Sequence, residues 1–233
     1  ANLVFGWFTL PETVTDETRR SFEPGRANPL GALRSVGRLS GVAPLLAIIF
    51  LTELAFISYV AVWAFWGKAA FGWSTTETGL SLAAFGLGAI VVQAWGVRLY
   101  LRVLGERGTI LFSFAYSFVW FILFALLPPT QFGGWLAIFF CPLSALGEVM
   151  WPVLQGRVSR LAPADMQGEA LGVVASMRSA AQVAGPLVMT AMFAWGAAFP
   201  VPFYGAPYLL GAALIALCLI LFRRSPEPAP ATP

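Results

Sequence analysis

The stretch Val42–Trp66, VAPLLAIIFLTELAFISYVAVWAFW, decides the fold of this chain. Its only charged residue is Glu53. A helix needs about 20 mostly apolar residues to cross about 30 Å of bilayer hydrocarbon. Backbone N–H and C=O groups in lipid must form hydrogen bonds within the protein. A single apolar segment satisfies all of them only by forming a helix. We therefore predict a transmembrane helix over Val42–Trp66.

Further apolar runs of the same kind follow along the chain. They are Gly79–Leu99, Gly108–Leu127, Gly134–Leu154, Leu171–Trp195 and Tyr204–Phe222. With the first run they predict an all-α membrane protein with six transmembrane helices. The expected domain plan is the end of a truncated transmembrane helix at 1–10, a cytoplasmic linker at 11–41, the six-helix domain at 42–222 and a disordered cytoplasmic tail at 223–233.

Composition points to the same class of protein. Of the 233 residues 58% are hydrophobic and only 11% are charged, whereas a soluble domain carries about 25% charged residues. The chain has no histidine, which excludes histidine-based catalytic triads and histidine-ligated zinc. Its two cysteines, Cys141 and Cys218, lie in apolar runs and indicate neither a disulfide framework nor a metal site. We therefore do not expect this protein to be an enzyme or to bind a cofactor or a metal ion.

Lysine and arginine are distributed asymmetrically around the predicted helices. Of the 14, five precede the first helix, three follow the second, two separate the fourth from the fifth and two follow the sixth. Six helices place all of these segments on one side, which the positive-inside rule makes cytoplasmic. Both ends of the chain are therefore expected in the cytoplasm. Because topology explains these arginines, they do not indicate a nucleic-acid partner.

Three charged residues lie inside predicted helices, namely Glu53, Glu148 and Arg178. A charge at the bilayer centre costs at least about 2.5–3.5 kcal/mol, and all three lie roughly 15–18 Å from the cytoplasmic end of their helix. The fourth and fifth helices are joined by a short turn, so Glu148 can reach Arg178. Two interpretations stay open: a pair that only pins helices together, or the lining of a polar cavity with a proton or substrate site. Glu53 either binds protons or faces water without a chemical role.

Helical spacing groups other polar residues with these charges. Glu148, Trp151 and Gln155 share one face of the fourth helix, and Arg178 and Gln182 share one face of the fifth. Gln93 lies on a face of the second helix with small residues. The third and sixth helices lack such faces and are expected to face lipid. Pro142 and Pro152 flank Glu148 and are expected to bend the fourth helix. The aromatic residues Phe56, Trp63 and Trp151 would suit a flat or cationic molecule.

Several short motifs carry a resemblance to a known family. Leu80–Gly86 (LSLAAFG), the loop Leu104-Gly105-Glu106-Arg107 and Gly185-Pro186-Leu187 occur in the order and context of the C-terminal half of a major facilitator superfamily transporter. The sequence resembles the tetracycline-efflux-like drug:proton antiporters of that superfamily. One departure is visible in the loop, where Leu101 rather than aspartate precedes Arg102.

This resemblance implies that the six helices are helices seven to twelve, forming one half-bundle built as a 3+3 inverted repeat with substrate near the midplane. It implies a bacterial inner-membrane location and, as partners, the lipid bilayer, an N-terminal six-helix half, protons and an unknown small molecule. The tight basic turn that contains Arg102, Gly105, Glu106 and Arg107 has two interpretations, an anchor that follows the positive-inside rule or a cytoplasmic gate loop. The alternative is a truncated, non-transporting half that serves as a structural subunit beside other membrane proteins.

Overall fold

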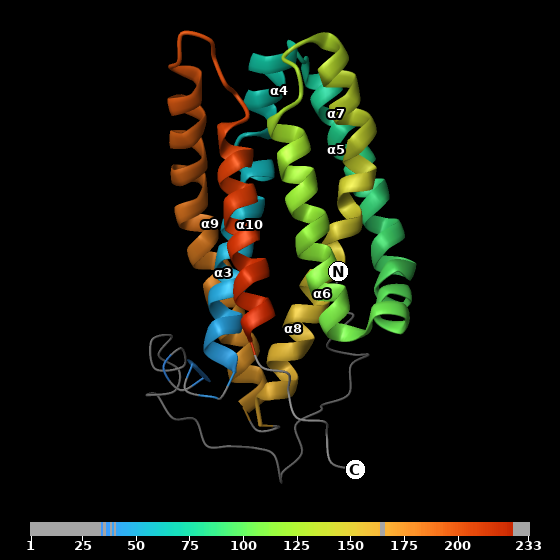
Figure 1. Cartoon of the computed structure of the whole chain (residues 1–233), viewed down its shortest axis with the longest axis vertical. Helices are drawn as coiled ribbons and strands as arrows, with labels where there is room; N and C mark the ends of the chain where they lie inside the picture. Colours follow the sequence, from blue (N-terminus) through green and yellow to red (C-terminus); the bar gives the residue numbers. More distant parts are fainter. Residues whose placement is uncertain (1–33, 35, 38, 40, 164–165, 226–233) are drawn as a thin grey trace, which may run out of the picture.

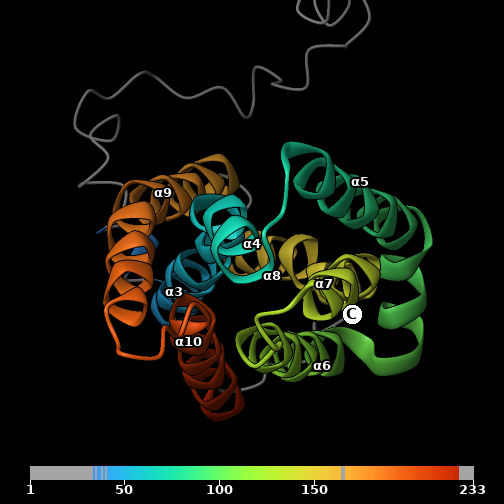
Figure 2. The same cartoon turned by 90° about the horizontal axis from the view of Figure 1, so that it is seen from above.

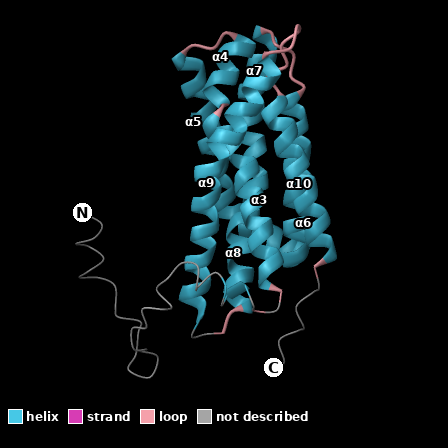
Figure 3. Cartoon of the chain, turned by 90° about the vertical axis from the view of Figure 1, so that its left-hand side faces the viewer, coloured by secondary structure: helices cyan, strands magenta, loops and turns pink. Residues whose placement is uncertain are grey.

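The computed structural model describes residues 34, 36–37, 39, 41–163 and 166–225 of the chain. Within these ranges the protein is helical, with short loops and no strand (Figure 3). The predicted helix end at 1–10, nearly all of the linker at 11–41 and most of the tail at 223–233 lie outside the described residues.

The helices stand roughly parallel to the long axis of an elongated bundle (Figure 1). They are α3 (Val42–Ala61), α4 (Trp63–Phe71), α5 (Thr75–Val91), the π-helix η1 (Val92–Gly96), α6 (Val97–Ala125), α7 (Gln131–Ser144), the 3₁₀ helix η2 (Ala145–Val149), α8 (Met150–Leu161), α9 (Gln167–Ala197) and α10 (Ala206–Arg224). In the described part of the chain, five continuous helical tracts are long and apolar enough to cross a membrane. All six predicted segments fall in or overlap these tracts.

The second and third predicted helices form one continuous tract, Thr75–Ala125, of 51 residues. At 1.5 Å per residue such a tract would be roughly 76 Å long, far more than one bilayer crossing requires. The chain reverses direction within it at Gly105, whose backbone is not helical (φ 65°, ψ −178°; Figure 1). The tract therefore crosses the bilayer twice, once on each side of Gly105.

Gly105 adopts a backbone conformation that side chains other than glycine rarely tolerate. Replacement by alanine is expected to destabilise the protein by about 1–3 kcal/mol, the range for a residue held in such a region. Gly79 in α5 is the matched control, because a Cβ there meets nothing within 4 Å and its backbone is helical. Unfolding titrations of both variants check the prediction. Equal stability of Gly105→Ala and Gly79→Ala would contradict it.

The local sequence explains why α4 ends and α5 begins where they do. Gly72 follows α4 with φ 73°, and the Gly72 and Trp73 amides donate to the Lys68 and Gly67 carbonyls, which closes the helix. Ser74 and Glu77 then form a capping box at the start of α5, with the Ser74 amide 2.7 Å from the Glu77 carboxylate.

The packing of the helices divides the bundle into two edges. Seen from above, α6 and α10 lie side by side along one edge, and α5 and α9 lie along the opposite edge (Figure 2). Between them, α3 packs against both α9 and α10, and α5 packs against α7. The third and sixth predicted helices thus share one edge, at which α10 also contacts α9.

Two glycines allow close contacts between neighbouring helices. A Cβ at Gly185 in α9 would stand 2.5 Å from Cγ2 of Ile57 in α3, and one at Gly88 in α5 would stand 2.3 Å from the Pro142 carbonyl oxygen in α7. These separations are shorter than van der Waals contact, so both positions require glycine for the helices to pack as they do.

Regular winding is interrupted near the middle of two helices. Over Val92–Gly96 the second predicted helix is a π-helix, and over Ala145–Val149 the fourth is a 3₁₀ helix. The 3₁₀ segment begins three residues after Pro142, which lacks an amide proton for the α-helical ladder. The two segments pack against each other and carry Gln93 and Glu148, respectively. Irregular turns of this kind are frequent at functional sites.

Candidate functional site

A charged network joins α3 to α9 near the centre of both helices. Glu53 is 7% exposed and accepts hydrogen bonds from Arg178 Nε at 3.1 Å and from Gln182 Nε2 at 3.2 Å. Arg178 and Gln182 are one turn apart on α9, so both reach the same carboxylate. The close approach of α3 and α9 at Gly185 brings the two helices within this range.

This pairing differs from the contact that the short turn between the fourth and fifth helices suggested. Arg178 forms its ion pair with Glu53 rather than with Glu148. Helix packing explains why Arg178 reaches Glu53. α9 lies along α3 for much of its length, whereas its contact with α8 is less extensive. Neighbours in sequence are therefore not the closest neighbours in space here.

Trp151 connects the second carboxylate to the network. The Arg178 guanidinium lies 5.1 Å from the centre of the Trp151 ring, a cation–π geometry. Glu148 lies three residues before Trp151, about one helical turn away, and so stands next to the network. Glu148 is half-buried. The structure thus brings Glu53, Glu148, Trp151, Arg178 and Gln182 into one cluster.

The remaining two predicted cavity residues lie at different distances from this cluster. Gln155 is exposed and borders a small cleft together with Trp151 and Arg178. Gln93 is also exposed, and it makes no hydrogen bond to a described residue. Its π-helical segment packs on the segment that carries Glu148, but Gln93 does not join the charged network.

The predicted gate loop connects three helix ends. Glu106 forms ion pairs with Arg157, at 3.3 Å, and with Arg160 at the end of α8. Arg107 donates to the backbone carbonyls of Arg223 and Ser225, at 2.8 Å and 3.0 Å, at the end of α10. Arg102 is exposed, and it takes no part in these contacts.

Three members of this loop cluster were not predicted from the sequence, namely Arg157, Arg160 and Phe222. Arg157 is 4% exposed, and its guanidinium lies 5.2 Å from the centre of the Phe222 ring. The Arg107 guanidinium lies 5.8 Å from the same ring. Spacing alone could have flagged Arg157, since it lies one turn from Arg160 on α8. Phe222 carries no such signal because it is one of 20 phenylalanines in an apolar chain.

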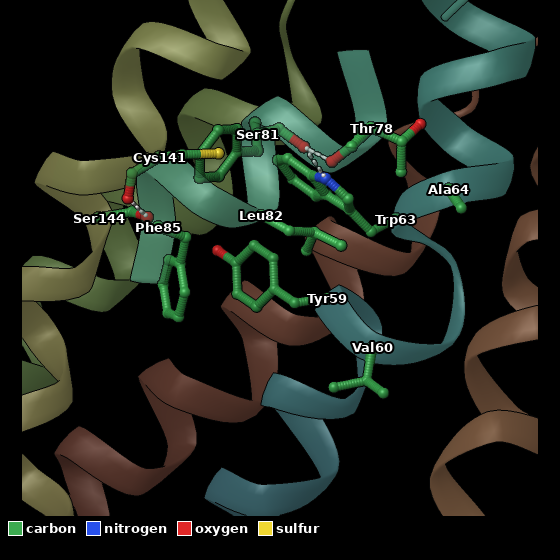
Figure 4. A pocket seen from close by; sticks show the side chains of 11 residues that line it. Tyr59, Val60, Trp63, Ala64, Thr78, Ser81, Leu82, Phe85, Cys141 and Ser144 are labelled. Carbon is green, nitrogen blue, oxygen red and sulfur yellow. Dashed lines mark hydrogen bonds between the residues drawn. The ribbon is translucent and has the colours of Figure 1, made fainter. Parts of the chain in front are cut away.

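An aromatic cavity lies between α3, α4, α5 and α7 (Figure 4), and Phe124 of α6 also lines it. Its volume is about 280 Å³. The side chains that line it are Tyr59, Val60, Trp63, Ala64, Thr78, Ser81, Leu82, Phe85, Phe124, Cys141 and Ser144. Of these, the sequence suggested only Trp63 as a contact for a bound molecule; Cys141 and the Leu80–Gly86 motif were noted without such a role. The cavity is lined by residues from five helices and therefore has no signature in any single segment.

Buried charges clustered across apolar helices are typical of transport proteins, because such residues mark pathways through the bilayer. The chain matches the model of the Major Facilitator Superfamily over residues 1–186 and again over residues 45–233. It belongs to this superfamily of membrane transporters, and the architecture is one half-bundle of the superfamily fold. The resemblance seen in the sequence is thereby confirmed.

Comparison with individual proteins supports the same family assignment. The chain is 33% identical over 224 residues to "Tetracycline resistance protein, class C" of Escherichia coli, a match that covers 96% of this chain and 54% of that protein. It is 34% identical over 202 residues to the class G protein of Vibrio anguillarum, covering 87% and 50%. "Hippocampus abundant transcript-like protein 1" of Homo sapiens is 22% identical over 224 residues. The chain spans about half the length of the tetracycline resistance proteins it matches.

Proposed function

We propose that this chain supplies one half of a proton-coupled efflux transporter for tetracycline-like small molecules. The observation that carries the proposal is the network in which Glu53 holds both Arg178 and Gln182 across the α3–α9 contact. The similarity to tetracycline resistance proteins supports the substrate class. An N-terminal six-helix half would complete the central cavity.

Charge counting within the network supports a role in proton coupling. Two carboxylates, Glu53 and Glu148, lie near a single guanidinium, that of Arg178, which forms its ion pair with Glu53. With all three groups ionised the cluster carries a net charge of one negative unit. Uptake of one proton makes it neutral, and neutrality is favoured inside a bilayer because uncompensated charge is costly there. The cluster can therefore bind and release a proton as the surroundings change.

A proton on Glu53 would also change the contact between helices. The ionised Glu53 ties α9 to α3 through Arg178 and Gln182. Protonation removes the ion pair and leaves Arg178 available to Glu148 or to an acceptor group in the cavity. Proton binding and helix contact are in this way linked through one side chain, which is what an antiporter requires.

The wider topology follows as part of the proposal. We place the protein in the bacterial inner membrane, with both ends in the cytoplasm and the loop of Glu106 and Arg107 on the cytoplasmic side. The membrane domain of this proposal is 42–222. The arginine-rich ends of α8 and α10, which the loop joins, support this orientation.

Transport by inside-out vesicles tests the proposed function. The chain is expressed with an N-terminal six-helix half, and tetracycline uptake is measured under an imposed pH gradient. The double variant Glu53→Gln/Glu148→Gln is expected to lose gradient-driven uptake down to the level of empty vesicles, because the cluster can no longer exchange a proton.

Glu77→Gln is the matched control for this experiment. It removes a carboxylate outside the cluster, and glutamine can also occupy the third position of a capping box. Uptake by this variant should equal that of the unmodified protein. Gradient-driven uptake that persists in Glu53→Gln/Glu148→Gln would rule out the proton-coupling role.

A further inference from the structure

The aromatic cavity between α3, α4, α5 and α7 has rigid, flat walls. The Trp63 indole donates a hydrogen bond to Ser81 Oγ at 2.8 Å, and Ser81 in turn donates to the Thr78 carbonyl at 2.7 Å (Figure 4). These bonds fix the plane of the Trp63 ring. Tyr59 is held by ring contacts at 5.0 Å to Phe121 and 5.6 Å to Tyr208. The cavity is therefore organised before any ligand arrives.

One hydrogen-bond donor in the cavity is unused. The Tyr59 hydroxyl points toward Phe85 and Ser144 (Figure 4), and it makes no hydrogen bond to a described residue. Ser144 donates its own hydroxyl proton to the Cys141 carbonyl at 2.8 Å. The Tyr59 hydroxyl is thus available to a ligand acceptor, and a polar group in an apolar setting is costly until it finds a partner.

The size of the cavity limits what it can hold. Its volume of about 280 Å³ exceeds the roughly 150 Å³ that accommodates benzene, and it is slightly below the roughly 300–1,000 Å³ of complete drug sites. It therefore suits a fused two-ring system, or one part of a larger molecule. Val60 and Leu82 line it and are exposed, which marks where it opens to the bundle surface.

We propose that this cavity binds a neutral, flat aromatic ring system whose edge carries a hydrogen-bond acceptor for the Tyr59 hydroxyl. The ring stacks against Trp63 and Phe85. An acyl chain fits the cavity less well, because it would leave the Tyr59 hydroxyl unpaired and would not match the flat walls. The inference rests on the proposed function in one respect: the ring belongs to the transported molecule, so the cavity is an internal subsite for part of that molecule.

Protection of Cys141 from labelling tests this subsite directly. Cys141 lines the cavity, and the chain has only one other cysteine, Cys218. In membranes containing the full chain with Cys218→Ala, the rate of Cys141 labelling by N-ethylmaleimide is measured by mass spectrometry. The probes are quinoline, naphthalene and decane, compared at equal concentrations in the membrane phase. Quinoline has two fused rings and an acceptor nitrogen, naphthalene lacks the acceptor, and decane imitates an acyl chain.

Quinoline is expected to halve the labelling rate at a concentration about 5-fold lower than naphthalene does, the effect of one hydrogen bond. Decane is expected to give no protection. Tyr59→Phe should abolish the preference for quinoline without changing protection by naphthalene. Tyr204→Phe removes a hydroxyl outside the cavity and should leave the preference intact.

Three results would overturn the subsite. They are equal protection by decane and quinoline, an unchanged quinoline preference in Tyr59→Phe, and a Cys141 that stays unlabelled while the unfolded chain labels fully. The assay uses neither a proton gradient nor a second half. Gradient-driven tetracycline uptake without protection therefore contradicts the subsite alone, and protection without uptake contradicts the proposed function alone.

Discussion

Replacing Arg178 with methionine is expected to lower the free energy of unfolding by about 2–3 kcal/mol. The variant leaves the Glu53 carboxylate, which is 7% exposed, without its cation. Loss of one partner of a fully buried ion pair costs about 3–5 kcal/mol. The expected loss is smaller because the Arg178 side chain is 42% exposed, so solvent already screens part of the interaction. Unfolding titrations in detergent micelles measure the effect.

The second substitution Glu53→Gln should recover most of this loss. In Glu53→Gln/Arg178→Met no uncompensated charge remains at the α3–α9 contact, and Gln182 can still bond to the side chain at position 53. Arg98→Met is the control, since Arg98 is exposed and such surface changes fall within about 0.5 kcal/mol. A double variant as unstable as Arg178→Met would show that the pair does not act as a unit.

Gly88→Val is expected to destabilise the protein by at least about 1–3 kcal/mol, the cost of overpacking a well-packed interior. A Cβ at this position would stand 2.3 Å from the Pro142 carbonyl oxygen and 2.8 Å from the Pro142 Cα. Both are backbone atoms, so no side-chain rotation relieves the clash and α5 must move away from α7. Because both helices line the aromatic cavity, protection of Cys141 by quinoline should weaken as well.

Gly86→Val separates this clash from the general effect of valine in a helix. Gly86 lies in α5 as well, and a Cβ there meets nothing within 4 Å. Gly86→Val should therefore stay close to the stability of the unmodified protein, as unfolding titrations of the pair can show. Equal losses in the two variants would mean that the α5–α7 contact does not limit packing at Gly88.

The sequence was sufficient for the membrane-spanning segments and for their family, but not for the helix break at Val62, which divides the predicted helix Val42–Trp66 into α3 and α4. Long apolar runs interrupted by arginine-rich segments leave few alternatives to a helical membrane bundle, because lipid forces every backbone group into internal hydrogen bonds. Gly105 also stood in a predicted turn, and its positive φ explains why a glycine is there. The charges at Glu53, Glu148 and Arg178 could be found because isolated charges in apolar runs are conspicuous.

The partners of those charges could not be predicted in the same way. Helical periodicity assigns a residue to a face, but it does not say which neighbour that face meets. Glu53 and Arg178 are 125 positions apart in sequence, and their contact depends on the packing of α3 along α9. The aromatic cavity and the stacking of Phe222 on two arginines likewise arise from the packing of several helices.

Labelling by a charged reagent tests most directly whether the buried charges share one water-filled interior. Single cysteines replace Glu148, Arg178, Val119 of α6 or Leu217 of α10 in a chain with Cys141→Ala and Cys218→Ala. Val119 and Leu217 are exposed and lie on the two helices expected to face lipid. We predict that a membrane-impermeant thiosulfonate labels positions 148 and 178, whereas positions 119 and 217 react only with a neutral, permeant reagent. Fast labelling at 119 and 217 with protection at 148 and 178 would contradict the account.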